Sequence, residues 1–331
     1  MDIFGTLGPS CQDPETLYQM FEEGMTGIRI NLSHIRLSDC RYDIENIHQA
    51  AQRAGIKPKL LIDLIGSELR IGSFDDSITV SAGDILTLGE GFIPLDQIIT
   101  ERIIPGSDVL LDDGHILGRV TEKNNSTVKL KIIRGGSLSS NKSIAISGLK
   151  IDLPSVNETD IKNLSYAKET GITGVMLPFV KKREDLVCLK DTLKKCGTGH
   201  LRIYAKIENA EGYANLPSFI DDCDEIIIAR GDLGNSMPLW ELPRAQKRIS
   251  AICRKRNKPF MVVTQMLTSM EHSSIPTRAE VSDIYNAVLD GASSVMVTGE
   301  TAIGDYPVDV IKYLSKTASA AITDINSLKI G

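Results

Sequence analysis

Charged side chains stand where short apolar runs of the sequence end. Lys206 and Glu208 close one such run, two positions apart, and Asp232 follows the next run along the chain. Because side chains alternate between the two faces of a β-strand, Lys206 and Glu208 share a face. Two carboxylates on neighbouring strands suit Mg²⁺ or Mn²⁺, which takes one or two carboxylates together with substrate oxygens. The alternative is a pair of carboxylates that Lys206 and Arg230 merely neutralise.

Other polar residues could bind an anion. Arg29 and Arg70, together with Lys206, suit phosphate or carboxylate oxygens. Gly231 opens the segment 231–234, whose backbone amides could face an anion before a helix. No group of His and Cys has the spacing of a zinc site. These features predict a metal-dependent site for a small anionic, phosphorylated substrate, which the spacing alone does not name.

Eight strand-like runs, each followed by a helical stretch, must position these side chains. The strands are expected at 3–7, 27–31, 59–64, 174–178, 202–207, 225–230, 260–264 and 294–298. The helices are expected at 13–23, 38–53, 158–170, 182–195, 209–219, 238–255, 276–290 and 307–322. Eight such units favour an α/β TIM (β/α)₈ barrel, with an open doubly wound sheet as the alternative. In such a barrel the carboxyl ends of the strands carry the chemistry.

A β-rich segment interrupts this rhythm after the third strand. Short runs at 77–80, 84–88, 108–111 and 127–133 alternate with turn residues, and no long helical period is visible. The expected domains are therefore a barrel made of 1–70 and 148–331, and a small all-β lid domain, 71–147, inserted into it.

The composition excludes several classes of protein. The 331 residues are 42% hydrophobic and 24% charged with a net charge of −6, so a basic field for nucleic acid or a membrane surface is not expected. No apolar run is long enough for a transmembrane helix, and the first residues resemble a strand more than a signal peptide. The six cysteines form no CxxC pair, which favours reduced thiols and a cytoplasmic location.

Nine short segments carry most of the polar residues. They are 8–10 (GPS), 29–34 (RINLSH), 63–70 (DLIGSELR), 112–114 (DDG), 206–212 (KIENAEG), 229–234 (ARGDLG), 264–267 (TQML), 276–280 (PTRAE) and 298–302 (TGETA). In this order they resemble the motifs of the pyruvate kinase family, among them RLNFSH, DTKGPEIR, ARGDLG and SGETA. The resemblance implies phosphoryl transfer between phosphoenolpyruvate and ADP, giving pyruvate and ATP.

The resemblance also implies residue roles on the substrate side. Lys206 would stabilise the transferring phosphoryl group and the enolate oxygen, and Arg29 would bind the phosphate. Glu208 and Asp232 would hold the divalent metal, Mg²⁺ or Mn²⁺. The substrate carboxylate would be held by the amides of Gly231 and Asp232 and by Thr264. Thr264 and Thr298 would lie near the carbon that is protonated.

Two further sets of residues follow from the same resemblance. The ligands of a monovalent cation, K⁺, would be Asn31, Ser33, Asp63 and Leu64, and Glu68 matches the glutamate of potassium-dependent members. The nucleotide would be bound by Pro9, Asn31, His34, Arg70 and Lys142.

Departures from the family pattern leave other functions open. Because the sequence given ends at Gly331, the family's C-terminal regulatory domain is expected to be absent. Leu64, Ile65 and Ser67 replace a threonine, a lysine and a proline. Most departures lie on the lid and the nucleotide side. The alternatives are an enzyme that uses the same Mg-enolate site with a different phosphoryl acceptor or as a 2-oxo acid lyase or decarboxylase, and a non-catalytic binding protein. The family also associates through its barrel, so a homodimer is compatible with the sequence.

Overall fold

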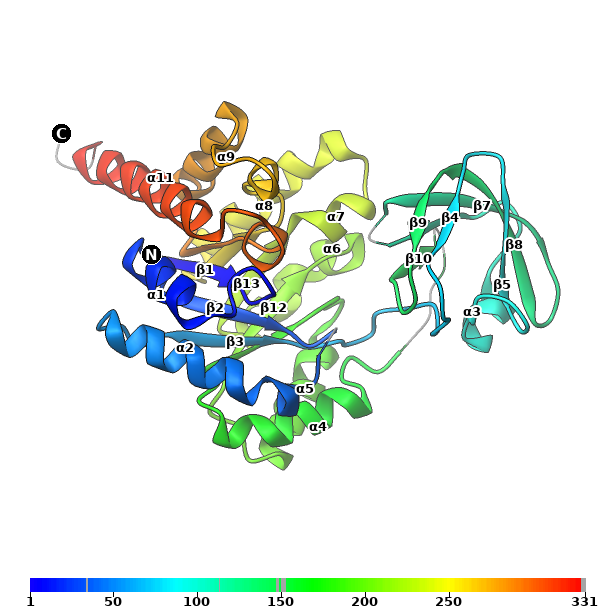
Figure 1. The fold of residues 1–331 in the computed structure, drawn as a ribbon, viewed down its shortest axis with the longest axis horizontal. Coiled ribbons are helices and arrows are strands. Elements are labelled where there is room, and N and C mark those ends of the chain that lie inside the picture. Colours follow the sequence, from blue (N-terminus) through cyan, green and yellow to red (C-terminus); the bar gives the residue numbers. More distant parts are fainter. Residues whose placement is uncertain (34, 113, 147–148, 150–152, 329–331) are drawn as a thin grey trace. The chain divides into compact units, whose positions relative to one another are not determined.

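Eight parallel strands form a closed barrel in the computed structural model, which describes residues 1–33, 35–112, 114–146, 149 and 153–328 (Figure 1). In barrel order they are β1 (Asp2–Thr6), β15 (Ser294–Met296), β14 (Phe260–Val263), β13 (Glu225–Ala229), β12 (Arg202–Ile207), β11 (Gly174–Leu177), β3 (Lys59–Asp63) and β2 (Gly27–Asn31). Strand β1 pairs with both β15 and β2, which closes the barrel and excludes the open sheet. The predicted (β/α)₈ barrel is confirmed.

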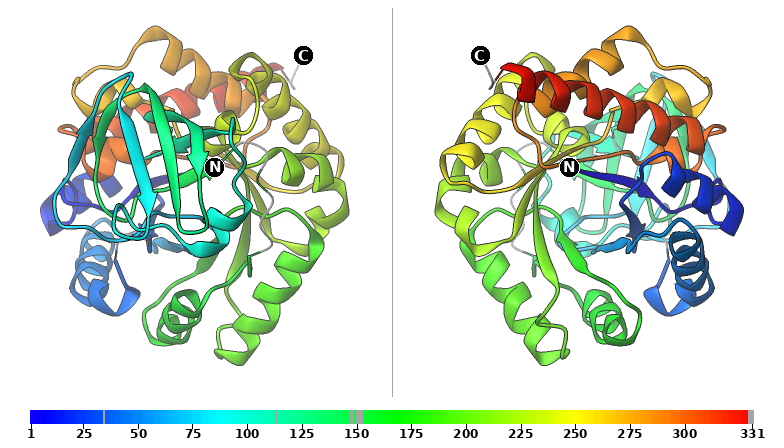
Figure 2. Two further views of the ribbon diagram at one scale, coloured as in Figure 1. Left: turned by 90° about the vertical axis from the view of Figure 1, so that its right-hand side faces the viewer. Right: turned by 90° about the vertical axis from the view of Figure 1, so that its left-hand side faces the viewer.

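Helices surround the strands (Figure 2). The long ones are α1 (Pro14–Glu22), α2 (Arg41–Arg53), α4 (Glu158–Tyr166), α5 (Arg183–Lys195), α6 (Ala210–Phe219), α8 (Leu242–Lys255), α9 (Arg278–Leu289) and α11 (Pro307–Leu328). Short helices and 3₁₀ turns join them: η1 (Leu37–Cys40), η2 (Ala167–Glu169), η3 (Ile220–Asp222), α7 (Arg230–Asn235), η4 (Leu239–Glu241), η5 (Thr268–Glu271) and α10 (Gly299–Ala302). Side chains at the N-caps fix several helix starts; Asp13, for example, accepts the amide of Thr16 at 2.9 Å. None of the helices that the structure describes is long and apolar enough to cross a membrane.

The barrel strands are buried on both faces, as expected of a parallel sheet covered by helices. Their inward side chains form an apolar interior that includes Phe4, Leu61, Tyr204 and Met261. Their outward side chains pack against the helices in a larger core that includes Ile28, Ile62 and Ile226. This alternation decides which residues at the strand ends point into the barrel.

The chain divides into two compact units, Met1–Gly66 with Pro154–Gly331, and Ser67–Leu153. The second unit is wider than the expected 71–147, because Leu69 and Leu153 pack against its own hydrophobic core. Its sheets are antiparallel: one has the order β10 (Ile144–Ile146), β6 (Asp108–Leu111), β7 (Ile116–Lys123), β8 (Thr127–Arg134) and β5 (Ile85–Gly89), and the other pairs β4 (Ile78–Val80) with β9 (Gly136–Leu138). The unit is not purely β, since it contains a short helix, α3 (Gln97–Arg102), that Asp96 caps.

Candidate active site

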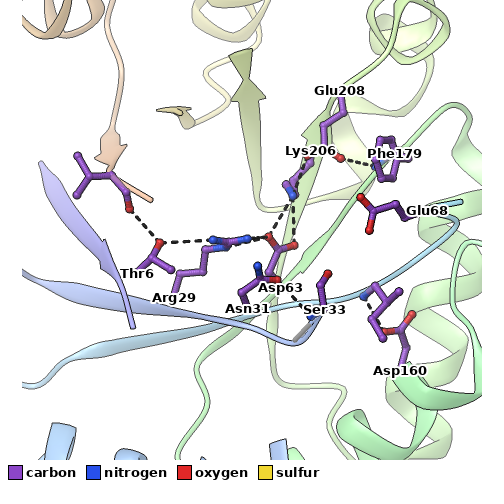
Figure 3. A network of polar contacts seen from close by, with 12 residues as sticks. Thr6, Arg29, Asn31, Ser33, Asp63, Glu68, Asp160, Phe179, Lys206 and Glu208 are labelled. Atoms are coloured by element: carbon purple, nitrogen blue, oxygen red, sulfur yellow. Dashed lines mark hydrogen bonds and ion pairs between the residues drawn. The ribbon is translucent and has the colours of Figure 1, made fainter. Parts of the chain in front are cut away.

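Lys206 lies at the centre of a buried network of charges at the carboxyl end of the barrel (Figure 3). Its Nζ is 3.1 and 3.3 Å from the two carboxylate oxygens of Asp63 and 2.7 Å from Oε1 of Glu208. Arg29 contacts one of these two oxygens, Oδ2 of Asp63, with its Nε at 2.9 Å and its Nη2 at 2.7 Å. Three strands, β2, β3 and β12, thus bring two cations and two carboxylates together.

The period of the strands explains why these four side chains meet. Leu61 and Tyr204 point into the apolar interior, so the inward positions two residues further on are Asp63 and Lys206. Ile28 and Ile30 pack outward against the helices, which turns Arg29 inward. The polar centre is therefore the next layer of the barrel interior, directly above its apolar filling.

Glu208 is held from two sides. Its side chain is almost fully buried; Oε2 accepts the backbone amide of Phe179 at 2.8 Å, while Oε1 faces Lys206. Oε1 has no hydrogen bond of good geometry to any described residue, although it forms the ion pair. Phe179 has a φ of 53°, an uncommon backbone conformation for a bulky residue, and this conformation accompanies the donation of its amide to Glu208. Oε1 thus already has a cationic partner in Lys206, and its remaining lone pairs could bind a metal ion.

The charges in this network fix one another's protonation. Burial alone would lower the pKa of the Lys206 ammonium, but the carboxylates of Asp63 and Glu208 outweigh burial and raise that pKa. Burial alone would raise the pKa of Asp63, but Lys206 and Arg29 outweigh burial and lower it. Lys206 is therefore a permanent cation here, suited to stabilising negative charge and unsuited to acting as a base.

The predicted monovalent-cation residues lie beside this network. Asn31 is paired in register with Asp63, and its Oδ1 accepts the amide of Ser33 at 3.2 Å. Leu64 is buried and donates its amide to the carbonyl of Met176, so its carbonyl is the only atom that could bind a cation. Glu68 belongs to the other compact unit, where it pairs with Arg70.

Thr264 and Gly231 are brought together at the ends of β14 and β13. The amide of Gly231 donates to Oγ1 of Thr264 at 2.7 Å, and that hydroxyl donates to the carbonyl of Val263 at 2.6 Å. The sequence suggested that the Gly231 amide could face an anion. In the structure this amide donates to the Thr264 hydroxyl. Thr264 itself has a φ of 70°, a strained conformation for a β-branched residue.

Arg230 holds this strained turn in place, a role that the sequence did not reveal. Its guanidinium donates to the carbonyls of Thr264, at 2.8 and 3.1 Å, and of Gln265, at 2.8 Å, and it pairs with Asp283. The sequence had left Arg230 as a neutraliser of Glu208 and Asp232. The ARGDLG motif was a signal for its importance, but not for its partners.

Thr298 is oriented by another residue that the sequence did not single out. Its amide and hydroxyl donate to Oε2 of Glu300, at 2.7 and 3.3 Å. Glu300 is fully buried, and its other oxygen accepts the amide of Leu267 at 3.1 Å. The TQML and TGETA segments are therefore tied together through one carboxylate.

The predicted divalent-metal residues, Glu208 and Asp232, come from neighbouring elements of the barrel. Glu208 directly follows β12. Asp232 lies in the first turn of α7, which directly follows β13, the neighbour of β12. Among the residues that the structure describes, no three His, Cys, Asp or Glu side chains gather as a metal cluster. A pair of carboxylates on adjacent elements, one with an oxygen lacking a hydrogen bond, nevertheless fits Mg²⁺, which takes its remaining ligands from substrate and water.

The predicted nucleotide residues divide between the two units. Pro9 and Asn31 belong to the barrel, whereas Arg70 and Lys142 lie side by side in the Ser67–Leu153 unit, where the amide of Ile71 donates to the carbonyl of Lys142. Arg70 donates to the carbonyl of Asn141 at 2.7 Å, and Lys142 pairs with Asp112 at 2.7 Å. His34, and Asp113 of the DDG segment, lie outside the described residues.

Fold and site together define a (β/α)₈-barrel protein with a buried network of paired charges at the carboxyl ends of its strands. A family model described as "Pyruvate kinase, barrel domain" matches residues 1–311. The pyruvate kinase of Aeropyrum pernix is 36% identical over 96% of this chain and 70% of its own length, and that of Mycobacterium tuberculosis is 34% identical over 99% and 73%. The pyruvate kinase of Bacillus licheniformis is 33% identical over 99% of this chain but only 58% of its own length. The chain belongs to the pyruvate kinase family, and it spans between just over half and about three quarters of these relatives.

Proposed function

We propose that the chain transfers a phosphoryl group from phosphoenolpyruvate to ADP, giving pyruvate and ATP. The observation that carries the proposal is the position of Lys206, a permanent cation between the buried carboxylates of Asp63 and Glu208 with Arg29 beside them. Phosphoryl transfer needs positioning and charge neutralisation more than covalent chemistry by the protein. A fixed ammonium and guanidinium at one point of the barrel rim provide both.

In the proposed reaction the bond between phosphorus and the enolate oxygen breaks, and a terminal oxygen of ADP forms the new bond to phosphorus. Lys206 stabilises the negative charge on the phosphoryl oxygens and on the departing enolate oxygen, and Arg29 binds the phosphate. The enolate then takes up one proton at its methylene carbon and becomes pyruvate. We place Thr264 and Thr298 beside that carbon, where Gly231 and Glu300 fix the orientation of their hydroxyls.

Glu208 and Asp232 would hold Mg²⁺ or Mn²⁺. The substrate carboxylate would be bound by Asp232, Thr264 and Gly231, whose amide would exchange the Thr264 hydroxyl for a carboxylate oxygen. The divalent ion supplies Lewis-acid stabilisation of negative oxygen when it is bound. Asn31, Ser33, Asp63 and the carbonyl of Leu64 would hold K⁺. We assign nucleotide binding to Pro9, Asn31, His34, Arg70 and Lys142. We also propose that the protein is a homodimer. A cytoplasmic location is in keeping with its six free thiols.

The test is to incubate the purified protein with phosphoenolpyruvate, Mg²⁺ and K⁺, with and without ADP, and to follow phosphorus and protons by NMR. We expect pyruvate and ATP to form together only when ADP is present, and to be lost in Lys206→Met. Lys168→Met, which removes an exposed lysine of the same unit, should keep the activity. Absence of ADP-dependent turnover in the wild-type protein would overturn the proposal.

A second candidate is transfer at the same enolate site to an acceptor other than ADP. The observation that favours it is Ile65, an apolar residue at the position where the DTKGPEIR motif has a lysine. The backbone amide of Ile65 donates to Asp160 at 2.9 Å. A lyase or decarboxylase acting on a 2-oxo acid would use the same centre. Exchange of the methyl protons of pyruvate with solvent, without ATP formation, would support this candidate over the first.

A further inference from the structure

A cavity of about 330 Å³ lies in the barrel unit between η1 and α4, and none of its lining residues belongs to the Lys206 network. Its walls are formed by Arg36, Ser38, Thr159, Lys162, Asn163 and Tyr166. All six side chains belong to the barrel unit, and none of them has a role in the proposed reaction.

Helix α4 presents a polar stripe to this cavity. Thr159, Lys162, Asn163 and Tyr166 follow the spacing i, i+3, i+4 and i+7, which places them on one face of the helix. Each of these side chains can donate a hydrogen bond, and the cavity has no carboxylate among its lining residues. The wall is therefore suited to oxygen acceptors and not to a cation.

Asn163 is the buried member of this wall. Only 4% of its surface is exposed, and its Oδ1 accepts the amide of Leu37 at 3.0 Å, which fixes the orientation of the side-chain amide. Its Nδ2 is left without a hydrogen-bond partner among the described residues. A buried donor without a partner costs free energy, which an acceptor oxygen bound at this wall would recover.

Two cations accompany this buried donor. Arg36, at the start of η1, and Lys162, on α4, are both exposed, and neither forms an ion pair with another described residue. The hydroxyl of Ser38 donates to Asp39 at 3.0 Å, so an anion would have to draw that hydroxyl away from a carboxylate. Arginine and lysine together favour a dianion, and phosphate oxygens match the guanidinium geometry.

We propose that this cavity binds a small phosphorylated anion, a phosphate monoester, at a site separate from the Lys206 centre. The cavity has room for more than a bare phosphate, and the ring of Tyr166 offers the organic part of the ligand a contact surface. The proposal does not depend on the reaction at Lys206. Arg36 belongs to the segment that follows β2. Thr159 is next to Asp160, which accepts the amides of Ile65 and Gly66 in the turn after β3. A bound ligand would therefore connect the segments that follow these two barrel strands.

Calorimetric titration with inorganic phosphate and with glycerol 2-phosphate tests the proposal. We expect the monoester to bind more tightly than phosphate, and the double variant Arg36→Gln/Lys162→Gln to bind it at least tenfold more weakly. The matched control Arg41→Gln/Lys168→Gln removes the same charge from exposed positions outside the cavity and should bind like the wild type. Equal affinity of both probes, or an equal loss in both double variants, would overturn it.

Local hydrogen exchange separates this site from phosphate binding near Arg29 and Lys206. The monoester should slow exchange in 36–40 and 158–166 in the wild type but not in Arg36→Gln/Lys162→Gln. A second variant, Asn163→Asp, keeps the acceptor for Leu37 and replaces the unpartnered NH₂ group by an oxygen, so it should abolish this protection while circular dichroism shows the fold retained. Protection that persists in both variants would contradict the proposal.

Discussion

Glu208 has two oxygens with different partners, and this difference makes its role testable. Oε2 accepts the amide of Phe179, whereas Oε1 faces Lys206. Glu208→Gln keeps an oxygen for Phe179 but removes the negative charge. We expect the Mg²⁺ concentration for half-maximal turnover to rise at least about tenfold. Mutation of a residue that only hydrogen-bonds a metal ligand already lowers metal affinity by about that factor.

The measurement is a Mg²⁺ titration of pyruvate formation at saturating phosphoenolpyruvate. Glu211→Gln, which neutralises an exposed carboxylate in the first turn of α6, is the matched control and should leave the titration unchanged. An unaltered Mg²⁺ requirement in Glu208→Gln would show that the metal is held elsewhere.

Arg230 stabilises the strained turn at Thr264 with several hydrogen bonds from one guanidinium. Lysine cannot reproduce this planar fork, so Arg230→Lys should release the turn and misplace the Thr264 hydroxyl. We expect kcat to fall roughly tenfold or more and the free energy of unfolding to fall by about 1–3 kcal/mol, the cost of leaving buried partners unsatisfied.

Steady-state kinetics and urea denaturation measure both effects. Arg244→Lys is the control. Arg244 lies in the first turn of α8 and forms an exposed ion pair with Glu241. If Arg230→Lys lost stability but kept kcat, Arg230 would be a purely structural residue.

The sequence predicted the charged residues of the site, but not the partners that orient them. Lys206, Glu208 and Asp63 stand at or directly after strand ends, where the period of two shows that Lys206 and Glu208 share a face. Phe179 donates its backbone amide, and the guanidinium of Arg230 donates to two backbone carbonyls. Backbone contacts between distant elements leave no residue pattern, so only the structure could reveal them.

At the scale of elements, helix α9 is joined to η5 through one side chain. Glu280 accepts the backbone amides of Thr277 and Ser269, each at 2.8 Å, as well as both of their hydroxyls. Burial would raise the pKa of Glu280, but these hydrogen bonds outweigh burial and lower it below its usual value. The same carboxylate thus caps α9 and anchors the turn that follows β14.

This lowered pKa makes a pH-dependent contribution to stability. Because the folded pKa lies below the unfolded one, the contribution is fully present above the unfolded value, near 4.5, and is lost as the pH falls through the folded pKa. Glu280→Gln should therefore be less stable than the wild type at pH 7, by about 1 kcal/mol, with the difference shrinking below pH 4.5.

Urea denaturation at a series of pH values measures this difference. Glu184→Gln, at the start of α5, is the control, since its carboxylate forms no capping box. A stability difference that stayed constant down to pH 3 would contradict the role of the ionised Glu280.

Long periodic elements were predictable and short ones were not. All eight barrel strands lie where apolar runs predicted them, to within two residues at their ends. Helices α3, α7 and α10 are too short to show a period of 3.6, and β7 was missed because its sequence, ILGRVTEK, mixes small and charged residues on an exposed sheet. Tertiary contacts, not local pattern, define these pieces.

At the scale of the whole molecule, the two compact units have separate hydrophobic cores. Leu130 lies in the core of the Ser67–Leu153 unit and Leu189 in that of the barrel, and the two clusters share no residue. Two separate cores permit unfolding in more than one step, which violates two-state behaviour. We expect the calorimetric enthalpy of unfolding to exceed the van't Hoff enthalpy.

Leucine-to-alanine variants assign the two steps. Each buried leucine should cost about 2–5 kcal/mol, Leu130→Ala lowering one thermal transition and Leu189→Ala the other. A single transition that both variants shift equally would show that the units unfold together.

The ends of the barrel segments around the second unit are fastened to each other by barrel residues alone. Asp160 accepts the amides of Ile65 and Gly66, each at 2.9 Å, and the side-chain amide of Asn157 donates to the carbonyl of Gly66 at 3.2 Å. The chain therefore leaves the barrel after Gly66 and returns at Pro154, and the hydrogen bonds that join these two ends do not involve the Ser67–Leu153 unit. We therefore expect that a short loop from Gly66 to Pro154 could replace the β unit at this junction without opening the barrel.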